Sequence, residues 1–206
     1  CTQLTEINVD EANPYFSSLD GVLTDKNRTT IVAYPAGKGK RYIIPDGITK
    51  IGTHSFFACY PITYIHIPNS VKTIELFAFA SCTDLDTIIL GNSVDSIEGA
   101  AFRINDRLKT IYSMNPIPPA AHPEAFSSFS PMFFIQCTLH VPVGSLQAYK
   151  NAEVWKNFKN IVENDFTGIE RPLPDKAKIF GNKNSIAFRN IEPDTDISIY
   201  DTTGKC

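Results

Sequence analysis

The sequence has no strong excess of charge of either sign. Nineteen Lys and Arg residues balance 22 Asp and Glu residues, giving a net charge of −3, so we expect no nucleic-acid partner, because the nucleic-acid backbone requires a basic face. No run approaches 18 apolar residues, so we expect no membrane span. The hydrophobic content of 43% predicts a folded chain rather than a disordered one.

The sequence also lacks the local motifs of common enzymes. It contains no nucleophile elbow, Walker loop, dinucleotide-binding glycine fingerprint or H-E-x-x-H pair. It has no C-x-x-C pair, which excludes the usual zinc and dithiol redox motifs. We therefore expect no catalytic residue, no metal site and no cofactor.

Isoleucine, in contrast, is abundant, with 24 Ile residues against 10 Leu and 9 Val. β-Branched side chains favour extended backbone, so this bias predicts strands rather than helices. The chain also repeats every 23 residues, which indicates an array of stacked units. Six columns carry the repeat: Ile44-Pro45, Ile67-Pro68 and Leu90-Gly91; Ile48, Val71 and Val94; Ile51, Ile74 and Ile97; Phe56, Phe79 and Phe102; Cys59, Cys82 and Asn105; Ile62, Leu85 and Leu108.

Each copy of the repeat has the same internal order. Residues 64–67 alternate as a short strand does, and Pro68 ends the strand because proline cannot donate to a ladder. A turn and a second short apolar pair follow, and then a helical turn that carries the buried Phe79. One copy cannot bury its apolar face alone, so we expect copies to stack about 4.8 Å apart into a parallel sheet.

This pattern resembles the BspA-like branch of the leucine-rich repeat superfamily. The resemblance is carried by Cys59-x-x-Ile62-x-x-Ile65-x-Ile67-Pro68-x-Ser70-Val71-x-x-Ile74-x-x-x-Ala78-Phe79-x-x-Cys82 and covers residues 1 to about 163. It implies an α/β-type leucine-rich repeat solenoid, in which 23-residue repeats form a curved parallel sheet with short helical or turn segments. Such repeats occur in surface proteins of Gram-negative gut and oral anaerobes, of protists and of treponemes.

The start of the chain departs from the regular period. Residues 4–9 match a repeat strand, and the surplus of residues that follows predicts a β-hairpin inserted at about residues 10–41. Cys1 precedes the predicted strand at the spacing of a repeat cysteine, which favours a cut through a longer array. The alternative is the lipidated first residue of a mature lipoprotein, which would give the protein a lipid anchor.

The end of the chain predicts a cap, a linker and a tail. Residues 138–163 resemble the C-terminal cap of these repeat proteins, and we expect Trp155 to cover the open end of the core. Residues 164–174 are predicted to be a linker, and residues 175–206 resemble the opening half of a β-sandwich tail. Strand-like segments in the tail are residues 177–180, 185–188 and 196–200.

Cysteines and histidines suggest no reactive centre. Cys59 and Cys82 occupy equivalent positions in adjacent copies, and we expect reduced core thiols rather than a disulfide, because parallel side chains have the wrong Cβ geometry for a bridge. His66 and His140 should point outward from strands about 14 Å apart. That separation excludes a shared metal ion, whose ligand bonds are near 2 Å.

The outward face of the first strand column is the candidate binding surface. Leucine-rich repeat proteins typically recognise partners with this face, and amphipathic aromatic residues suit contact with protein or glycan. Its predicted residues are Glu6, Asn8, Arg41, Ile43, Tyr64, His66, Thr87, Ile89, Thr110, Tyr112 and His140. Of these we select Arg41, Tyr64, His66, Ile89, Tyr112 and His140 as ligand-binding candidates.

The expected function follows from the resemblance. It implies a non-catalytic protein at the cell surface or secreted, on the exterior of the outer membrane of a Gram-negative anaerobe, that binds a host or bacterial surface protein or glycan. A structural spacer that displays another domain is the alternative. A glycan-active enzyme is a lesser alternative, because its two carboxylates must converge across a cleft and the acidic residues on turns show no such arrangement.

Overall fold

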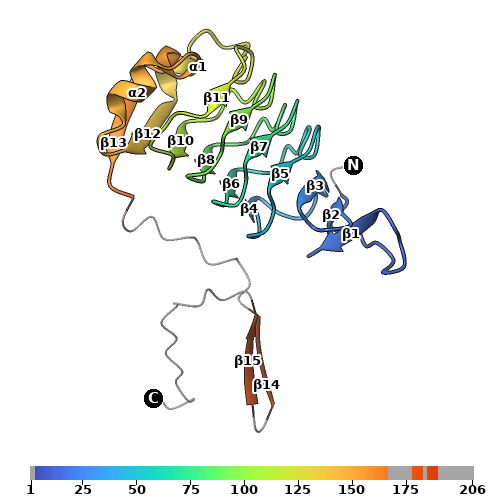
Figure 1. Ribbon diagram of the computed structural model, residues 1–206. Coiled ribbons are helices and arrows are strands. Elements are labelled where there is room, and N and C mark those ends of the chain that lie inside the picture. The colour runs from blue at the N-terminus through green and yellow to red at the C-terminus, as the bar shows by residue number, and fades with distance from the viewer. Residues whose placement is uncertain (1–2, 167–177, 183–184, 190–206) are drawn as a thin grey trace, which may run out of the picture. The chain divides into compact units, whose positions relative to one another are not determined.

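The computed structural model describes residues 3–166, 178–182 and 185–189. The chain divides into two compact units, Cys1–Gly168 and Ile169–Cys206, which are described separately. The larger unit is a β-solenoid with parallel strands and few helical residues, in which successive turns stack side by side (Figure 1). This architecture confirms the stacked repeats that the 23-residue columns predict and the leucine-rich repeat solenoid that the resemblance implies.

One side of the solenoid is a six-stranded parallel sheet. Tyr64 pairs with Thr87, and Thr87 pairs with Thr110, so neighbouring strands are related by steps of 23 residues. In spatial order its strands are β4 (Arg41–Ile43), β6 (Tyr64–Ile67), β8 (Thr87–Leu90), β10 (Thr110–Ser113), β12 (Thr138–Pro142) and β13 (Asn160–Asn164).

The second apolar segment of each repeat contributes a short strand to a further sheet that the sequence columns did not predict separately. These strands have two residues each, stack in parallel and contain the isoleucines of one column, Ile51, Ile74 and Ile97. The sheet contains β1 (Phe16–Leu19), β2 (Val22–Asp25), β3 (Thr30–Ala33), β5 (Lys50–Ile51), β7 (Thr73–Ile74), β9 (Ser96–Ile97) and β11 (Ala120–Ala121), in this order. The predicted hairpin is therefore an antiparallel β1–β2–β3 meander, and β3 joins it to the solenoid by pairing with β5.

The prediction of a repeat strand at residues 4–9 is wrong. This segment has no strand, because its backbone hydrogen bonds go to loops instead of to β4. The Ile7 N–H donates to the Gly21 carbonyl at 2.8 Å, and the Leu4 carbonyl accepts from the Gly37 N–H at 2.7 Å. Glu6 and Asn8 consequently do not belong to the strand face.

A ladder of aromatic rings runs through the core between the two sheets. Phe56, Phe79, Phe102 and Phe126 are fully buried, and successive ring centroids are 4.7, 5.2 and 5.2 Å apart. Tyr34 extends the ladder toward the N-terminus by stacking on Phe56 at 4.7 Å. Each repeat thus contributes one ring, which is why the phenylalanine column recurs at the repeat period.

The C-terminal cap closes the end of this ladder. It contains α1 (Phe133–Gln136), α2 (Leu146–Asn151) and the 3₁₀ helix η1 (Trp155–Asn157). Trp155 is completely buried, its ring packs edge-on against Phe126 at 5.5 Å, and its Nε1–H donates to the Pro119 carbonyl at 2.7 Å. This confirms that the tryptophan covers the core.

The cap ends in a strand, although the apolar residues from Leu146 to Ile161 follow one another at roughly helical spacing in the sequence. Residues Asn160–Asn164 form the strand β13, which pairs in parallel with β12 over its whole length. Two features favour this strand. The edge of β12 has backbone N–H and C=O groups that need hydrogen-bond partners, and the β-branched Ile161 and Val162 favour extended backbone.

The second unit contains a two-stranded antiparallel sheet of β14 (Lys178–Asn182) and β15 (Ser185–Arg189). Their positions agree with two of the three strand-like segments in the tail. The third segment, at residues 196–200, and most of the predicted linker lie outside the described residues. The β-sandwich and the boundaries at residues 163 and 174 stay predictions.

Candidate functional site

The outward face of the six-stranded sheet carries two rows of side chains. Alternate residues of the same strands, such as Ile65 and Ile88, are buried in the core, and strand pairing puts the others side by side along the solenoid. The first row is Arg41, Tyr64, Thr87, Thr110, Thr138 and Asn160, and the second is Ile43, His66, Ile89, Tyr112, His140 and Val162. We call these two rows the strand face. All six candidate residues belong to it.

Three of the six candidates are much less accessible than predicted. Tyr64, His66 and Ile89 are only 8%, 7% and 3% exposed. Side chains on neighbouring strands are about 4.8 Å apart, so large residues in the rows cover one another, as Arg41 covers the Tyr64 ring. The more accessible candidates are Arg41, which is exposed, and Tyr112 and His140, which are half-buried.

Arg41 and Tyr64 form a pair at one end of the first row. The guanidinium carbon of Arg41 lies 4.0 Å from the centroid of the Tyr64 ring, a cation–π arrangement. The Tyr64 hydroxyl is buried and makes no hydrogen bond within the described part of the chain. Burial raises the pKa of Tyr64 above its usual value, although the charge of Arg41 opposes this shift. The phenol is therefore a neutral group that can still donate a hydrogen bond.

Tyr112 and His140 form an aromatic stack toward the other end. Their ring centroids are 4.6 Å apart and the planes differ by 20°. Phe166, which follows β13, packs edge-on against Tyr112 at 6.4 Å. No sequence column includes Phe166, so its place beside the strand face was not predicted.

His140 is held as a neutral imidazole. Its Nδ1 is buried and has no hydrogen-bond partner among the residues that the structure describes. Burial lowers the pKa of His140 below its usual value of 6.5. The ring thus combines an apolar stacking surface with an uncharged polar edge at neutral pH.

The histidines of the strand face are too far apart to share a ligand ion. His66 on β6 and His140 on β12 are separated by β8 and β10, as the sequence predicts. Across residues 3–166 and the two tail strands, no three His, Cys, Asp or Glu side chains are grouped closely enough to hold a metal. Within the same residues, no helix has the length and apolar character needed to cross a bilayer.

The repeat cysteines have a structural role. Cys59, Cys82 and Cys137 are buried free thiols, which confirms the prediction of reduced core cysteines for the first two. The Cys82 thiol donates to the Phe56 carbonyl at 3.0 Å, and the Asn105 amide, one repeat later, donates to the Phe79 carbonyl at 2.9 Å. This column therefore requires a small buried donor. Burial raises the pKa of Cys59 to about 11, so the thiol is not a nucleophile at neutral pH.

The chain matches the family model of the BspA type leucine rich repeat region in six copies, over residues 35–140. The matched segment comprises 106 of the 206 residues. No curated protein matches the chain.

Several solved structures are similar to the chain. The pneumococcal vaccine antigen PcpA has a TM-score of 0.51 and 18% identity, covering 78% of this chain and 50% of that one. A leucine rich cell surface protein from Faecalibacterium prausnitzii has a TM-score of 0.40 and 17% identity, covering 74% and 40%. A leucine-rich repeat protein from Bacteroides capillosus has a TM-score of 0.43 and 20% identity, covering 79% and 99%. The chain spans half the length of the pneumococcal antigen, and the likeness to it concerns the fold alone.

Proposed function

Because the chain belongs to the BspA-type leucine-rich repeat family, we propose that it is a non-catalytic binding protein that engages a surface protein or glycan through its strand face. The observation that carries this proposal is the Tyr112–His140 stack with Phe166 beside it. Aromatic rings that present both an apolar plane and a polar edge are enriched at recognition surfaces.

The two rows of the strand face support contact with an extended partner. The first row carries hydroxyl groups of Thr87, Thr110 and Thr138 in register on three neighbouring strands, and Arg41 adds a positive charge at one end. The second row lies alongside and is apolar and aromatic. A partner with alternating polar and apolar surface can satisfy both rows at once, which gives the strand face specificity as well as contact area.

We further propose that the protein acts at the cell surface or after secretion, on the exterior of a Gram-negative anaerobe. The family to which the chain belongs supports this location, and Cys59, Cys82 and Cys137 are buried, which protects their thiols in an oxidising environment.

Binding of the full chain to panels of host surface proteins and of bacterial and host glycans tests the proposal. For any partner that binds, the Tyr112→Ala/His140→Ala double variant is expected to lower the affinity at least tenfold, which is a typical loss for central aromatic contacts. Lys72→Ala is the matched control, because this exposed residue lies beside β7 of the other sheet. If the double variant binds as tightly as the unmodified chain, the strand face is not the binding surface.

A further inference from the structure

The turns that follow the seven-stranded sheet contain a recurring contact between a carboxylate and a backbone amide. Glu75, Glu98 and His122 are structurally equivalent, because each donates its backbone N–H to the isoleucine carbonyl of the preceding repeat. The acceptors are Ile51, Ile74 and Ile97, respectively, each at 2.9 Å. The Glu75 carboxylate accepts a hydrogen bond from the Thr53 N–H at 3.0 Å. The Glu98 carboxylate accepts one from the Leu76 N–H at 3.1 Å. A carboxylate therefore binds the amide of the neighbouring turn in two successive repeats.

In the next repeat the carboxylate is replaced by the imidazole of His122. Its Nδ1 accepts a hydrogen bond from the Glu124 N–H at 3.2 Å, within its own turn, and so does not serve the amide of Gly99. His54 and Phe77 occupy the position of Ala100 in the two preceding repeats. The His54 N–H donates to the Leu76 carbonyl, and the Phe77 N–H donates to the Gly99 carbonyl, whereas the Ala100 N–H has no equivalent hydrogen bond in the described part of the chain. Among the hydrogen bonds of the described residues, none has the Gly99 or Ala100 N–H as donor.

These two amides are adjacent, and both residues are buried. Ala100 adopts the left-handed region with φ of 54°, whereas Gly99 does not. Successive N–H groups in turns with one left-handed residue can form a concave nest that binds anions. A ligand oxygen at this point supplies the acceptor that the described residues do not.

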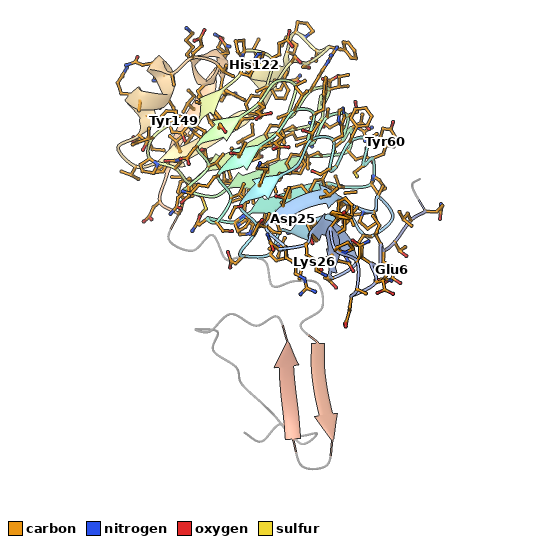
Figure 2. All side chains as sticks on the ribbon, turned by 45° about the vertical axis from the view of Figure 1, so that its right-hand side comes forward. Glu6, Asp25, Lys26, Tyr60, His122 and Tyr149 are labelled. Carbon is orange, nitrogen blue, oxygen red and sulfur yellow. The ribbon has the colours of Figure 1, made fainter. Side chains whose placement is uncertain are left out.

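A cavity of about 560 Å³ opens at the same place. Apolar groups of Leu76, Phe77, Ala100 and Ala121 line it beside Gly99, and His122 forms part of its wall. Its volume is in the range of small-molecule sites. Figure 2 shows His122 on the outer surface of the solenoid, away from Asp25 and Lys26 of the hairpin. The cavity is thus separate from the strand face, whose residues do not line it.

We propose that this cavity binds a small apolar monocarboxylate. Its carboxylate accepts hydrogen bonds from the Gly99 and Ala100 N–H groups, and its hydrocarbon part packs against Leu76, Phe77 and Ala121. The class of ligand follows from the protein itself, because Glu75 and Glu98 present a carboxylate to the equivalent amide in the two preceding turns. Glu98 and Glu124 both line the cavity and repel an anion, so the affinity of the unmodified chain is low to moderate.

Amide chemical shifts of the full ¹⁵N-labelled chain test the proposal, with hexanoate as the probe and hexanamide as its uncharged isostere. Hexanoate is expected to shift the Gly99 and Ala100 resonances saturably, and hexanamide to bind at least tenfold more weakly. His122→Glu supplies the missing internal carboxylate and is expected to weaken hexanoate binding at least tenfold. Glu124→Gln removes part of the repulsion and is expected to tighten binding about threefold.

His122→Leu is the matched control, because it removes the imidazole without adding a carboxylate. Hexanoate is expected to bind this variant within threefold of the unmodified chain. The proposal is overturned if hexanoate leaves Gly99 and Ala100 unshifted, if hexanamide binds equally well, or if the Glu and Leu variants at position 122 lose binding to the same extent.

Discussion

At the scale of single residues, the turns of the solenoid store backbone strain at recurring positions. His54, Phe77 and Ala100 adopt positive φ at intervals of 23 residues, and Ala58, Ser81 and Ile104 do so a few residues later in each turn. None of these is glycine, although an L-residue in the left-handed region costs about 1–2 kcal/mol. The packing of each turn against its neighbours therefore imposes a conformation that the local sequence disfavours.

Ile104 is the most strained of these residues, because it is β-branched and has φ of 57°. Replacing it by Asn, which tolerates the left-handed region, is expected to raise the free energy of unfolding by roughly 1 kcal/mol. Chemical denaturation measures the change. Ile117→Asn is the control at an exposed position that has no positive φ, and its expected effect is within about 0.5 kcal/mol. A loss of stability in Ile104→Asn would show that its apolar contacts outweigh the strain.

At the scale of elements, the β2–β3 turn depends on one carboxylate. Asp25 accepts hydrogen bonds from the N–H groups of Thr29 and Thr30, both at 2.7 Å, and from the Thr29 hydroxyl. Burial alone would raise the pKa of Asp25, but these hydrogen bonds lower it below its ordinary value of 3.8. The stabilisation is therefore complete above the unfolded-state pKa and is lost as the pH falls through the lower folded-state pKa.

The pH dependence of an Asp25→Ala variant follows from this shift. At pH 7 the substitution is expected to cost about 2 kcal/mol, because charge-assisted hydrogen bonds are lost, and the cost shrinks toward pH 2 as the pH approaches the lowered folded-state pKa of Asp25. Urea denaturation at both pH values measures it. Asp95→Ala, which removes an exposed ion pair with Lys72, is the control and is expected to cost less than about 1 kcal/mol. An equal cost of Asp25→Ala at both pH values would contradict the account.

The C-terminal cap is the element that holds the open end of the core. Trp155→Ala removes a fully buried ring and its hydrogen bond to the Pro119 carbonyl, so we expect a loss of about 3–5 kcal/mol in the free energy of unfolding. Circular dichroism during thermal unfolding follows the loss. Phe129→Ala is the control, because this side chain is exposed, and it is expected to change the free energy of unfolding little. A small effect of Trp155→Ala would mean that the repeats are stable without the cap.

At the scale of the whole molecule, the sequence predicts the repeating elements more completely than the elements that occur once. The 23-residue columns predict the stacked strands and the phenylalanine ladder, because each is a local pattern multiplied by stacking. The irregular course of residues 4–9 could not be predicted, since its backbone partners Gly21 and Gly37 lie in non-repeating loops.

The candidate site was likewise predicted only where it depends on the repeat. Alternation along each strand identifies the outward face, but it contains no information on how densely that face is packed, so the burial of Tyr64, His66 and Ile89 was not predicted. The contact between Phe166 and Tyr112 depends on the path of the chain after β13, which no period encodes.

The central claim is that the strand face contacts the partner, and hydroxyl-radical footprinting of side chains tests it most directly. In the presence of a saturating partner, oxidation of Tyr112, His140 and Phe166 is expected to fall at least threefold relative to the free chain. Oxidation of Phe57 and Tyr60, which are exposed on a turn outside the strand face, is expected to stay unchanged. Protection of Phe57 and Tyr60 with unchanged oxidation of Tyr112, His140 and Phe166 would contradict the claim.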